Sequence, residues 1–251
     1  MAAIISLEKS MDKSFYKTLN EIKSECPSDV IVKEINDYIL MKYDKKSLTI
    51  DNEKTLGLFR SIIVKDDNLV CFAPQKAINF NNFIVDNDFD DCEITEFIPG
   101  TMLNIFYDET SGEEIKWQIC TRSNIGARCR YSDFAWDKLN KDCCYSFVLE
   151  HPENTNLSNV REATITLTHV YKILNNNIQD ITNEINIDNI NKPRNIKELH
   201  PDISDWLKLV ELCADKDYNM NEAGFVIKNK NKQRTKILNI SFLSAKSLNG
   251  N

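Results

Sequence analysis

The residues of this chain best suited to chemistry are cations that stand beside short apolar runs. Arg60, Lys76 and Arg122 each lie next to such a run, and a denser basic group occupies residues 228–236. A guanidinium group can grip phosphate oxygens through two parallel hydrogen bonds, and an ammonium group binds phosphate as a point charge. Each of these cations alone would be read as a solvated surface charge. Together they indicate a site for a polyphosphate or for a nucleic-acid backbone.

Other familiar motifs are not supported by the residue spacing. Residues 86–91 space their aspartates like a calcium loop, but Asp91 stands where that loop needs glycine and Phe97 where it needs glutamate. The three histidines are isolated and the eight cysteines form no Cys-x-x-Cys pair, so we expect reduced thiols and no metal ligands. Glycine-rich phosphate loops and the Gly-x-Ser-x-Gly nucleophile motif are also absent from the sequence.

Composition and charge narrow the class of protein. The chain has 251 residues, of which 42% are hydrophobic, so a folded core is expected. It carries 31 Lys and Arg against 38 Asp and Glu, a net charge of −7. Bulk charge therefore does not attract nucleic acid, and a phosphate site must be a local cluster of cations. The first residues do not form a secretory signal and no run is long enough to span a bilayer, so we expect a cytoplasmic protein without a membrane partner.

The elements that must position these cations are predicted to be mainly short strands. Runs rich in β-branched residues predict strands within residues 30–43, 58–64, 69–72, 102–107, 115–120, 145–149 and 163–173. Near the C-terminus, residues 224–227 and a second run through Ile237 predict a pair of strands joined by the basic group.

Helices are predicted in fewer places. An N-terminal helical segment spans residues 1–27, with an amphipathic helix in residues 7–22. A second helix begins after Asp202, which can cap it. Its expected apolar face consists of Ile203, Trp206, Leu207, Val210, Leu212 and Cys213. Residues 175–195 predict a polar insertion or a poorly ordered connection. Many short strands with few helices predict an α+β fold dominated by antiparallel sheet.

Several segments, taken in order, carry a family resemblance. They are residues 59–64, 74–80, 96–101, 117–123, 147–154, 224–227 and 234–236. This series resembles the motifs of the nucleotidyltransferase domain of phage-type RNA ligases, in the divergent form found in large DNA viruses. The resemblance implies the ligase adenylation-domain fold, with mainly antiparallel sheets flanked by helices, as a single domain over residues 1–251. It also implies that the C-terminal domain with which such ligases select nucleic acid is missing.

The nucleophile of that family is absent from its matching position. These ligases attack the α-phosphate of ATP with the lysine of a Lys-x-Asp-Gly motif, whereas the matching stretch here is Phe97-Ile98-Pro99-Gly100. A phenyl ring cannot form a phosphoramidate. Lys76, which lies near retained cations in the motif series, is the substitute nucleophile that we would predict for an active enzyme.

The acidic motif positions also depart from the family. Val148 stands where a carboxylate is expected, with Glu150 nearby, and Ala223 replaces the glutamate of a Glu-Gly motif, with Glu222 displaced by one residue. In a strand, such a displacement would turn the side chain to the other face. The loss of these acids argues against a bound Mg²⁺, and no metal ligands are predicted.

The phosphate-binding positions, in contrast, are retained. The resemblance matches Arg60, Lys76 and Lys236 to cations that hold the triphosphate of ATP. With the residues around them, the implied nucleotide- or phosphate-binding set is Arg60, Lys76, Gly100, Thr101, Arg122, Glu150, Lys228 and Lys236. ATP or RNA is the implied ligand of this set.

The sequence leaves more than one function open. The first is a catalytically degenerate, RNA-ligase-like protein that binds nucleotide or RNA phosphates. The second is an active ATP-dependent RNA ligase that uses Lys76 as its nucleophile. The third is a structural or interaction protein, such as a viral assembly component, that keeps only the fold. Phosphate binding predicts that ATP or short RNA raises the melting temperature, whereas a structural role predicts no such shift.

Overall fold

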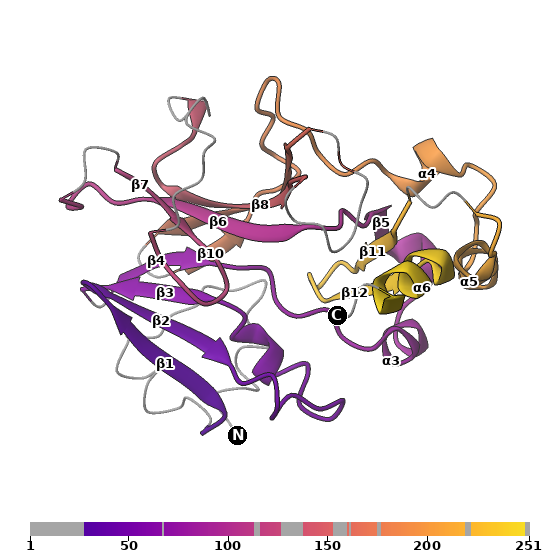
Figure 1. The fold of residues 1–251 in the computed structure, drawn as a ribbon, viewed down its shortest axis with the longest axis horizontal. Coiled ribbons are helices and arrows are strands. Elements are labelled where there is room, and N and C mark those ends of the chain that lie inside the picture. Colours follow the sequence, from indigo (N-terminus) through magenta and orange to yellow (C-terminus); the bar gives the residue numbers. More distant parts are fainter. Residues whose placement is uncertain are drawn as a thin grey trace. The chain divides into compact units, whose positions relative to one another are not determined.

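A computed structural model describes residues 28–66, 68–112, 116–126, 138–152, 160, 162–174, 177–218 and 222–248. The helical segment predicted at residues 1–27 lies outside this range. The described chain consists mainly of antiparallel strands with a few short helices, as the sequence predicts (Figure 1). None of the helices in these residues is long and apolar enough to cross a membrane.

The chain divides into two compact units, each of which has more residue contacts within itself than with the other unit. Unit 1 comprises Met1–Lys76, Met102–Phe147 and Leu167–Ile190. Unit 2 comprises Ala77–Thr101, Val148–Thr166 and Asn191–Asn251. Both units are therefore assembled from stretches that are far apart in the sequence. A single domain over residues 1–251 stays a prediction.

Unit 1 contains a four-stranded antiparallel sheet. Its strands, in spatial order, are β1 (Val30–Ile35), β2 (Tyr38–Tyr43), β3 (Ile62–Lys65) and β4 (Asn68–Phe72). The apolar run predicted at residues 30–43 is thus two strands rather than one. The chain reverses at Asn36, whose φ of 52° is tolerated by asparagine better than by most residues. A short 3₁₀ turn, η1 (Leu56–Leu58), precedes β3.

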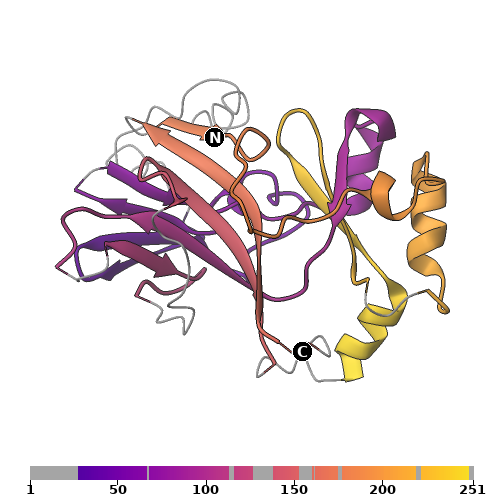
Figure 2. The ribbon, with the colours of Figure 1, turned by 90° about the horizontal axis from the view of Figure 1, so that it is seen from above.

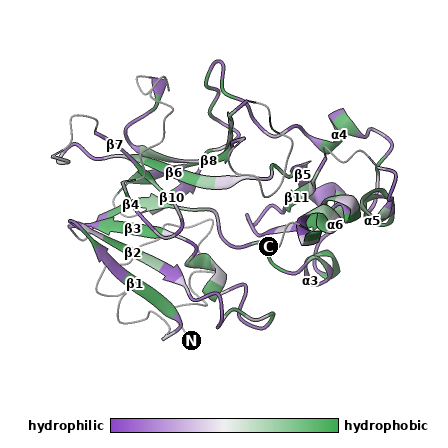
Figure 3. Ribbon diagram, viewed as in Figure 1, coloured by the Kyte–Doolittle hydropathy of each residue, from purple (hydrophilic) through white to green (hydrophobic). Residues whose placement is uncertain are grey.

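Both faces of β3 are buried within unit 1, which explains why this strand is apolar for most of its length (Figure 3). Successive side chains of a strand point to opposite faces. Ile62 and Val64 accordingly join one apolar cluster, which also contains Met41. Ile63, between them, joins a second cluster together with Cys71.

A second, five-stranded sheet continues the antiparallel pattern. Its order is β10-β9-β8-β6-β7, formed by β6 (Thr101–Tyr107), β7 (Trp117–Cys120), β8 (Cys143–Glu150), β9 (Thr164–Leu174) and β10 (Asn177–Asp180). Strand β10 lies within residues 175–195, where we predicted a polar insertion or a poorly ordered connection. It pairs with β9, and Ile181 and Ile187 beyond it are buried. The many asparagines hide this strand from a composition-based prediction.

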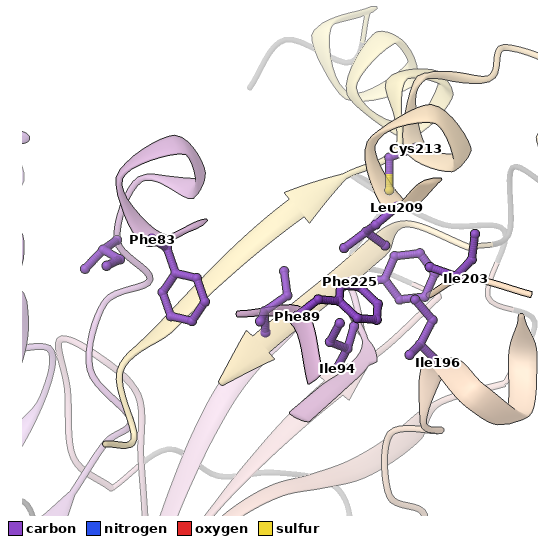
Figure 4. Close-up of a cluster of buried hydrophobic side chains, with 10 residues drawn as sticks. Phe83, Phe89, Ile94, Ile196, Ile203, Leu209, Cys213 and Phe225 are labelled. Atoms are coloured by element: carbon purple, nitrogen blue, oxygen red, sulfur yellow. The ribbon is translucent and has the colours of Figure 1, made fainter. Parts of the chain in front are cut away.

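Unit 2 is built around a three-stranded sheet with the order β12-β11-β5. The strands are β5 (Glu93–Glu96), β11 (Gly224–Lys228) and β12 (Arg234–Leu238). The β11–β12 pair runs beside helix α3 (Phe80–Val85), as Figure 2 shows. The remaining elements are η2 (Phe89–Asp91), α4 (Ile196–Leu199), α5 (Trp206–Ala214) and α6 (Ile240–Leu248). Side chains from the helices and the sheet form one apolar core, which includes Phe83, Ile94, Leu209 and Phe225 (Figure 4).

Helix α5 corrects the sequence prediction in two respects. Its cap is Asp205, whose side chain accepts a hydrogen bond from the N–H of Lys208, and not Asp202. The apolar face is also rotated, because Leu207 is 67% exposed and Val210 is 38% exposed, whereas Leu209 is fully buried. Cys213, one helical turn after Leu209, is buried as predicted. The continuous apolar composition of this helix left its buried face ambiguous.

Candidate functional site

Unit 1 gathers three cations beside Tyr43. We call Lys42, Arg60 and Arg122 the cation cluster. Lys42 lies on β2 and is only 8% exposed, and its Nζ donates a hydrogen bond to Ser123 Oγ at 2.7 Å. Arg122 follows β7, and its guanidinium lies 4.2 Å from the centre of the Tyr43 ring while Nη2 donates to the Tyr43 carbonyl at 2.5 Å.

The electrostatics of the cation cluster are unfavourable without a counter-ion. Burial lowers the pKa of Lys42, and the nearby positive charges of Lys33, Arg122 and Lys45 lower it further, against a smaller opposing effect of Asp44. Burial also lowers the pKa of the Arg60 guanidinium, and the charge of Arg122 adds to that effect. Buried charges of the same sign destabilise one another unless an opposite charge joins them.

No acidic partner balances this charge within the described residues. Neither Lys42, Arg60 nor Arg122 forms an ion pair with a carboxylate of that part of the chain. The Nε of Arg122 is also buried without a hydrogen-bond acceptor there. A donor that is removed from water and has no acceptor costs about 1–3 kcal/mol. An anion would supply both the missing charge and the missing acceptor.

The cation cluster contains two of the predicted residues and one that the sequence analysis missed. Arg60 and Arg122 were predicted, and the structure brings them together in unit 1. Lys42 was not predicted, although a lysine within the apolar strand Tyr-Ile-Leu-Met-Lys-Tyr is an available sign of a buried charge. Lys76 also belongs to unit 1, where its N–H donates to the carbonyl of Gly57 at 2.9 Å. It is therefore held to the turn η1 that leads into Arg60.

In unit 2, Phe97 is the residue that the sequence resemblance matches to the ligase nucleophile. Phe97 follows β5, and its N–H donates to the carbonyl of Gly224 at 2.7 Å. Its ring packs edge to face against Phe242, with 6.2 Å between the ring centres. The Nζ of Lys236 lies 5.0 Å from the centre of the same ring, a cation–π geometry. Lys236, which the resemblance matches to a triphosphate-binding cation, thus contacts the phenylalanine at the predicted nucleophile position.

Other predicted residues of unit 2 have structural surroundings of their own. A Cβ on Gly100 would lie 2.4 Å from the Leu149 carbonyl oxygen, so only glycine allows this close approach of two backbones. Thr101 is exposed at the start of β6. Lys228 forms an ion pair with Glu93 at 3.1 Å, so its charge has a carboxylate partner. A role in phosphate binding stays a prediction for these residues, as it does for Lys236.

Glu150 lines a cavity of about 380 Å³ that lies entirely within unit 2. We call it the unit 2 pocket, and it is lined by Glu96, Phe97, Ile98, Pro99, Glu150, Thr164, Thr166, Asn191, Lys192, Arg194, Glu222 and Ala223. Glu150 stands two residues after Val148 on β8, so both lie on the same face of the strand. Burial raises the pKa of Glu150, and the charge of Glu96 raises it further, while a hydrogen bond from Thr164 at 3.2 Å opposes the shift.

The displaced Glu222 also reaches this pocket, which differs from the prediction. Strand β11 begins at Gly224, so Glu222 precedes it and the alternation of strand faces does not apply. Tyr218 donates a hydrogen bond to its carboxylate, and His200 Nε2 lies 2.9 Å from Oε2. Although burial alone would raise the pKa of Glu222, these hydrogen bonds lower it.

The third pocket glutamate is neutralised by an arginine. Arg194 Nη2 lies 2.7 Å from Glu96 Oε2, and Arg194 Nε lies 3.1 Å from both carboxylate oxygens. The backbone N–H of Arg194 donates to Glu96 Oε1 at 2.8 Å as well. This pair was not predicted, because its partners are separated by 98 positions in the sequence. The contacts of Glu222 with Tyr218 and His200 were not predicted either. Among the described residues, no group of three His, Cys, Asp or Glu side chains is arranged to hold a metal ion.

Solved structures of ligases are similar to this chain in fold. One is named "Putative ATP-dependent DNA ligase from Aquifex aeolicus", with a TM-score of 0.53 and 14% identity over 92% of this chain. Another is an archaeal ATP-dependent RNA ligase, with a TM-score of 0.51 and 14% identity over 90% of this chain. The chain spans 63% and 62% of the length of these structures. No protein-family model and no curated protein matches the sequence. The chain therefore has a ligase-like fold.

Proposed function

We propose that this protein binds the phosphates of a nucleotide or of RNA at the cation cluster, without forming a lysyl-nucleotide at the usual motif position. One observation carries the proposal: Lys42, Arg60 and Arg122 are gathered in unit 1 without a carboxylate partner among the described residues. Phosphate oxygens would accept hydrogen bonds from these donors, including the buried Nε of Arg122.

Two further observations support the proposal. The ligase-like fold makes a nucleotide or a nucleic acid the first ligand to consider, with ATP as the nucleotide implied by the motif resemblance. The Phe97 ring offers no nucleophile, and Lys236 faces that ring. We also propose that the ligase-like fold is the nucleotidyltransferase fold of phage-type RNA ligases, in the form found in large DNA viruses.

The chemistry of binding follows from charge and donor geometry. Arg122 already stacks on Tyr43 and donates one N–H to its carbonyl, so its guanidinium is held in place before a ligand arrives. A hydrogen bond to a charged group contributes about 1.5–3 kcal/mol. Loss of one such contact should therefore weaken binding by about tenfold to a hundredfold.

Titration calorimetry with tripolyphosphate tests the proposal, because this anion has no base or sugar. Arg60→Ala and Arg122→Ala should each weaken binding by about tenfold or more. The matched control is Lys208→Ala, which removes an exposed lysine on α5 and should leave the affinity unchanged. Equal affinity of the wild type and both arginine variants would contradict the proposal.

Lys76 remains the predicted nucleophile of the alternative, an active ligase. If the protein is an active ligase, incubation with ATP labelled in its α-phosphate should label the wild-type protein covalently. The label should be absent from Lys76→Ala. The other alternative, a structural protein, expects no response to phosphate ligands in either variant or wild type.

A further inference from the structure

The walls of the unit 2 pocket come from separate parts of unit 2. The segment from Asn191 to Asn195 connects two strands through isolated β-bridges. Asn191 forms such a bridge with Thr166 of β9, and Asn195 forms one with Thr95 of β5. The N–H of Glu96 also donates to the carbonyl of Arg194 at 2.9 Å. At about 380 Å³, the cavity is within the size range of pockets for small molecules.

The three carboxylates of the unit 2 pocket differ in how many hydrogen-bond donors and cationic groups they contact. Glu96 is held by both nitrogens of the Arg194 fork, and Glu222 is held by Tyr218 and His200. Glu150 accepts only the Thr164 hydroxyl at 3.2 Å, and it has no cationic partner in the described parts of the chain. A half-buried carboxylate with a single hydroxyl donor can accept further hydrogen bonds.

The lining of this pocket also defines what it would exclude. Lys192 and Arg194 line the pocket together with Glu96, Glu150 and Glu222, and Arg194 is paired with Glu96. A phosphate group beside Glu150 would still meet the like charge of that carboxylate. A metal ion is not favoured, because no suitable group of three ligands exists among the described residues. Ile98, Pro99 and Ala223 add apolar surface next to the carboxylate.

We propose that the unit 2 pocket binds a small organic cation whose primary ammonium group pairs with Glu150. An ammonium group donates three hydrogen bonds, and the Glu150 carboxylate supplies acceptors at the pocket wall, with the Thr164 hydroxyl oxygen 3.2 Å from it. The aliphatic part of the ligand lies against Ile98 and Pro99. This site is separate from the cation cluster and takes a ligand of the opposite charge.

Calorimetric titration with putrescine tests this site, with the neutral diol of the same chain length as the control ligand. We expect putrescine to bind and the diol not to bind. Glu150→Gln, which keeps the size of the side chain, should weaken putrescine binding by about tenfold or more. Glu211→Gln, which changes an exposed glutamate of α5, should bind putrescine like the wild type.

Two additional measurements separate this proposal from the proposed function. The Arg122→Ala variant should bind putrescine with unchanged affinity, since that residue belongs to unit 1. Acidification should weaken putrescine binding, because the raised pKa of Glu150 brings its protonation closer to neutral pH. Equal binding of putrescine and the diol would overturn the proposal, as would full affinity in Glu150→Gln. Either result would leave the tripolyphosphate test untouched.

Discussion

Replacing Asp108 with asparagine should destabilise unit 1 in a way that depends on pH. Asp108 follows β6 and is buried, with its side chain only 6% exposed. Its carboxylate accepts a hydrogen bond from Lys65 Nζ at 2.7 Å, a second from the Tyr38 hydroxyl, and a third from the Thr110 N–H at 2.9 Å. These contacts join the two sheets that also carry Lys42 and Arg122.

The size of the effect follows from the pKa of Asp108. Burial acts to raise this pKa, but the hydrogen bonds from Lys65, Tyr38 and Thr110 lower it from 3.8 to about 2. At about 1.4 kcal/mol for each pH unit, the shift is equivalent to about 2.5 kcal/mol of stability at pH 7. Asp108→Asn loses this contribution and also leaves the charge of Lys65 without its carboxylate, so the total loss should be about 3–4 kcal/mol.

The pH dependence has a definite sign. Because the folded pKa lies below the unfolded value, the stabilisation is complete at neutral pH and disappears as the pH falls from about 4 to about 2. Urea unfolding followed by circular dichroism at several pH values measures the difference between wild type and Asp108→Asn. We expect this difference to shrink by about 2.5 kcal/mol on acidification. Glu34→Gln, an exposed change on β1, should show no comparable loss at pH 7. A loss in Asp108→Asn that stays constant across this pH range would refute the reasoning.

Two further predictions concern packing in unit 2, and both use melting temperature or urea unfolding as the measurement. Leu209→Ala should cost about 2–5 kcal/mol because Leu209 is fully buried, whereas Leu207→Ala, at a position 67% exposed, should cost little. Equal losses would contradict the assigned face of α5. Gly100→Ala should destabilise the protein because its Cβ would lie 2.4 Å from the Leu149 carbonyl oxygen, whereas Gly112→Ala meets no atom within 4 Å. An unchanged stability of Gly100→Ala would show that the two backbones are not this close.

Much of the fold is predictable from local sequence patterns. The β-branched runs identify most of the described strands. The two strands predicted around the basic group form a hairpin, although residues 228 and 234–236 of this group belong to the strands and only residues 229–233 form the turn. Strand β10 and the buried face of α5 were missed or misassigned. In both cases the local pattern is ambiguous, and pairing with β9 or packing against the core decides the outcome.

The candidate sites were predictable only in part, because they depend on contacts between distant residues. Arg60 and Arg122 were found through their place beside strands, but nothing local indicates that they converge with Lys42. The pairing of Glu96 with Arg194 likewise joins two residues separated by 98 positions. Residue types can indicate which chemistry is available, whereas tertiary structure decides which groups meet.

The central claim is that the cation cluster binds phosphates without covalent transfer to the protein. Incubation with ATP labelled in its α-phosphate, followed by counting of the retained label before and after denaturation, tests it directly. We predict that wild type retains label before denaturation and none afterwards, and that Arg60→Ala combined with Arg122→Ala retains little at either stage. Label that survives denaturation, or undiminished retention by the double variant, would contradict the claim.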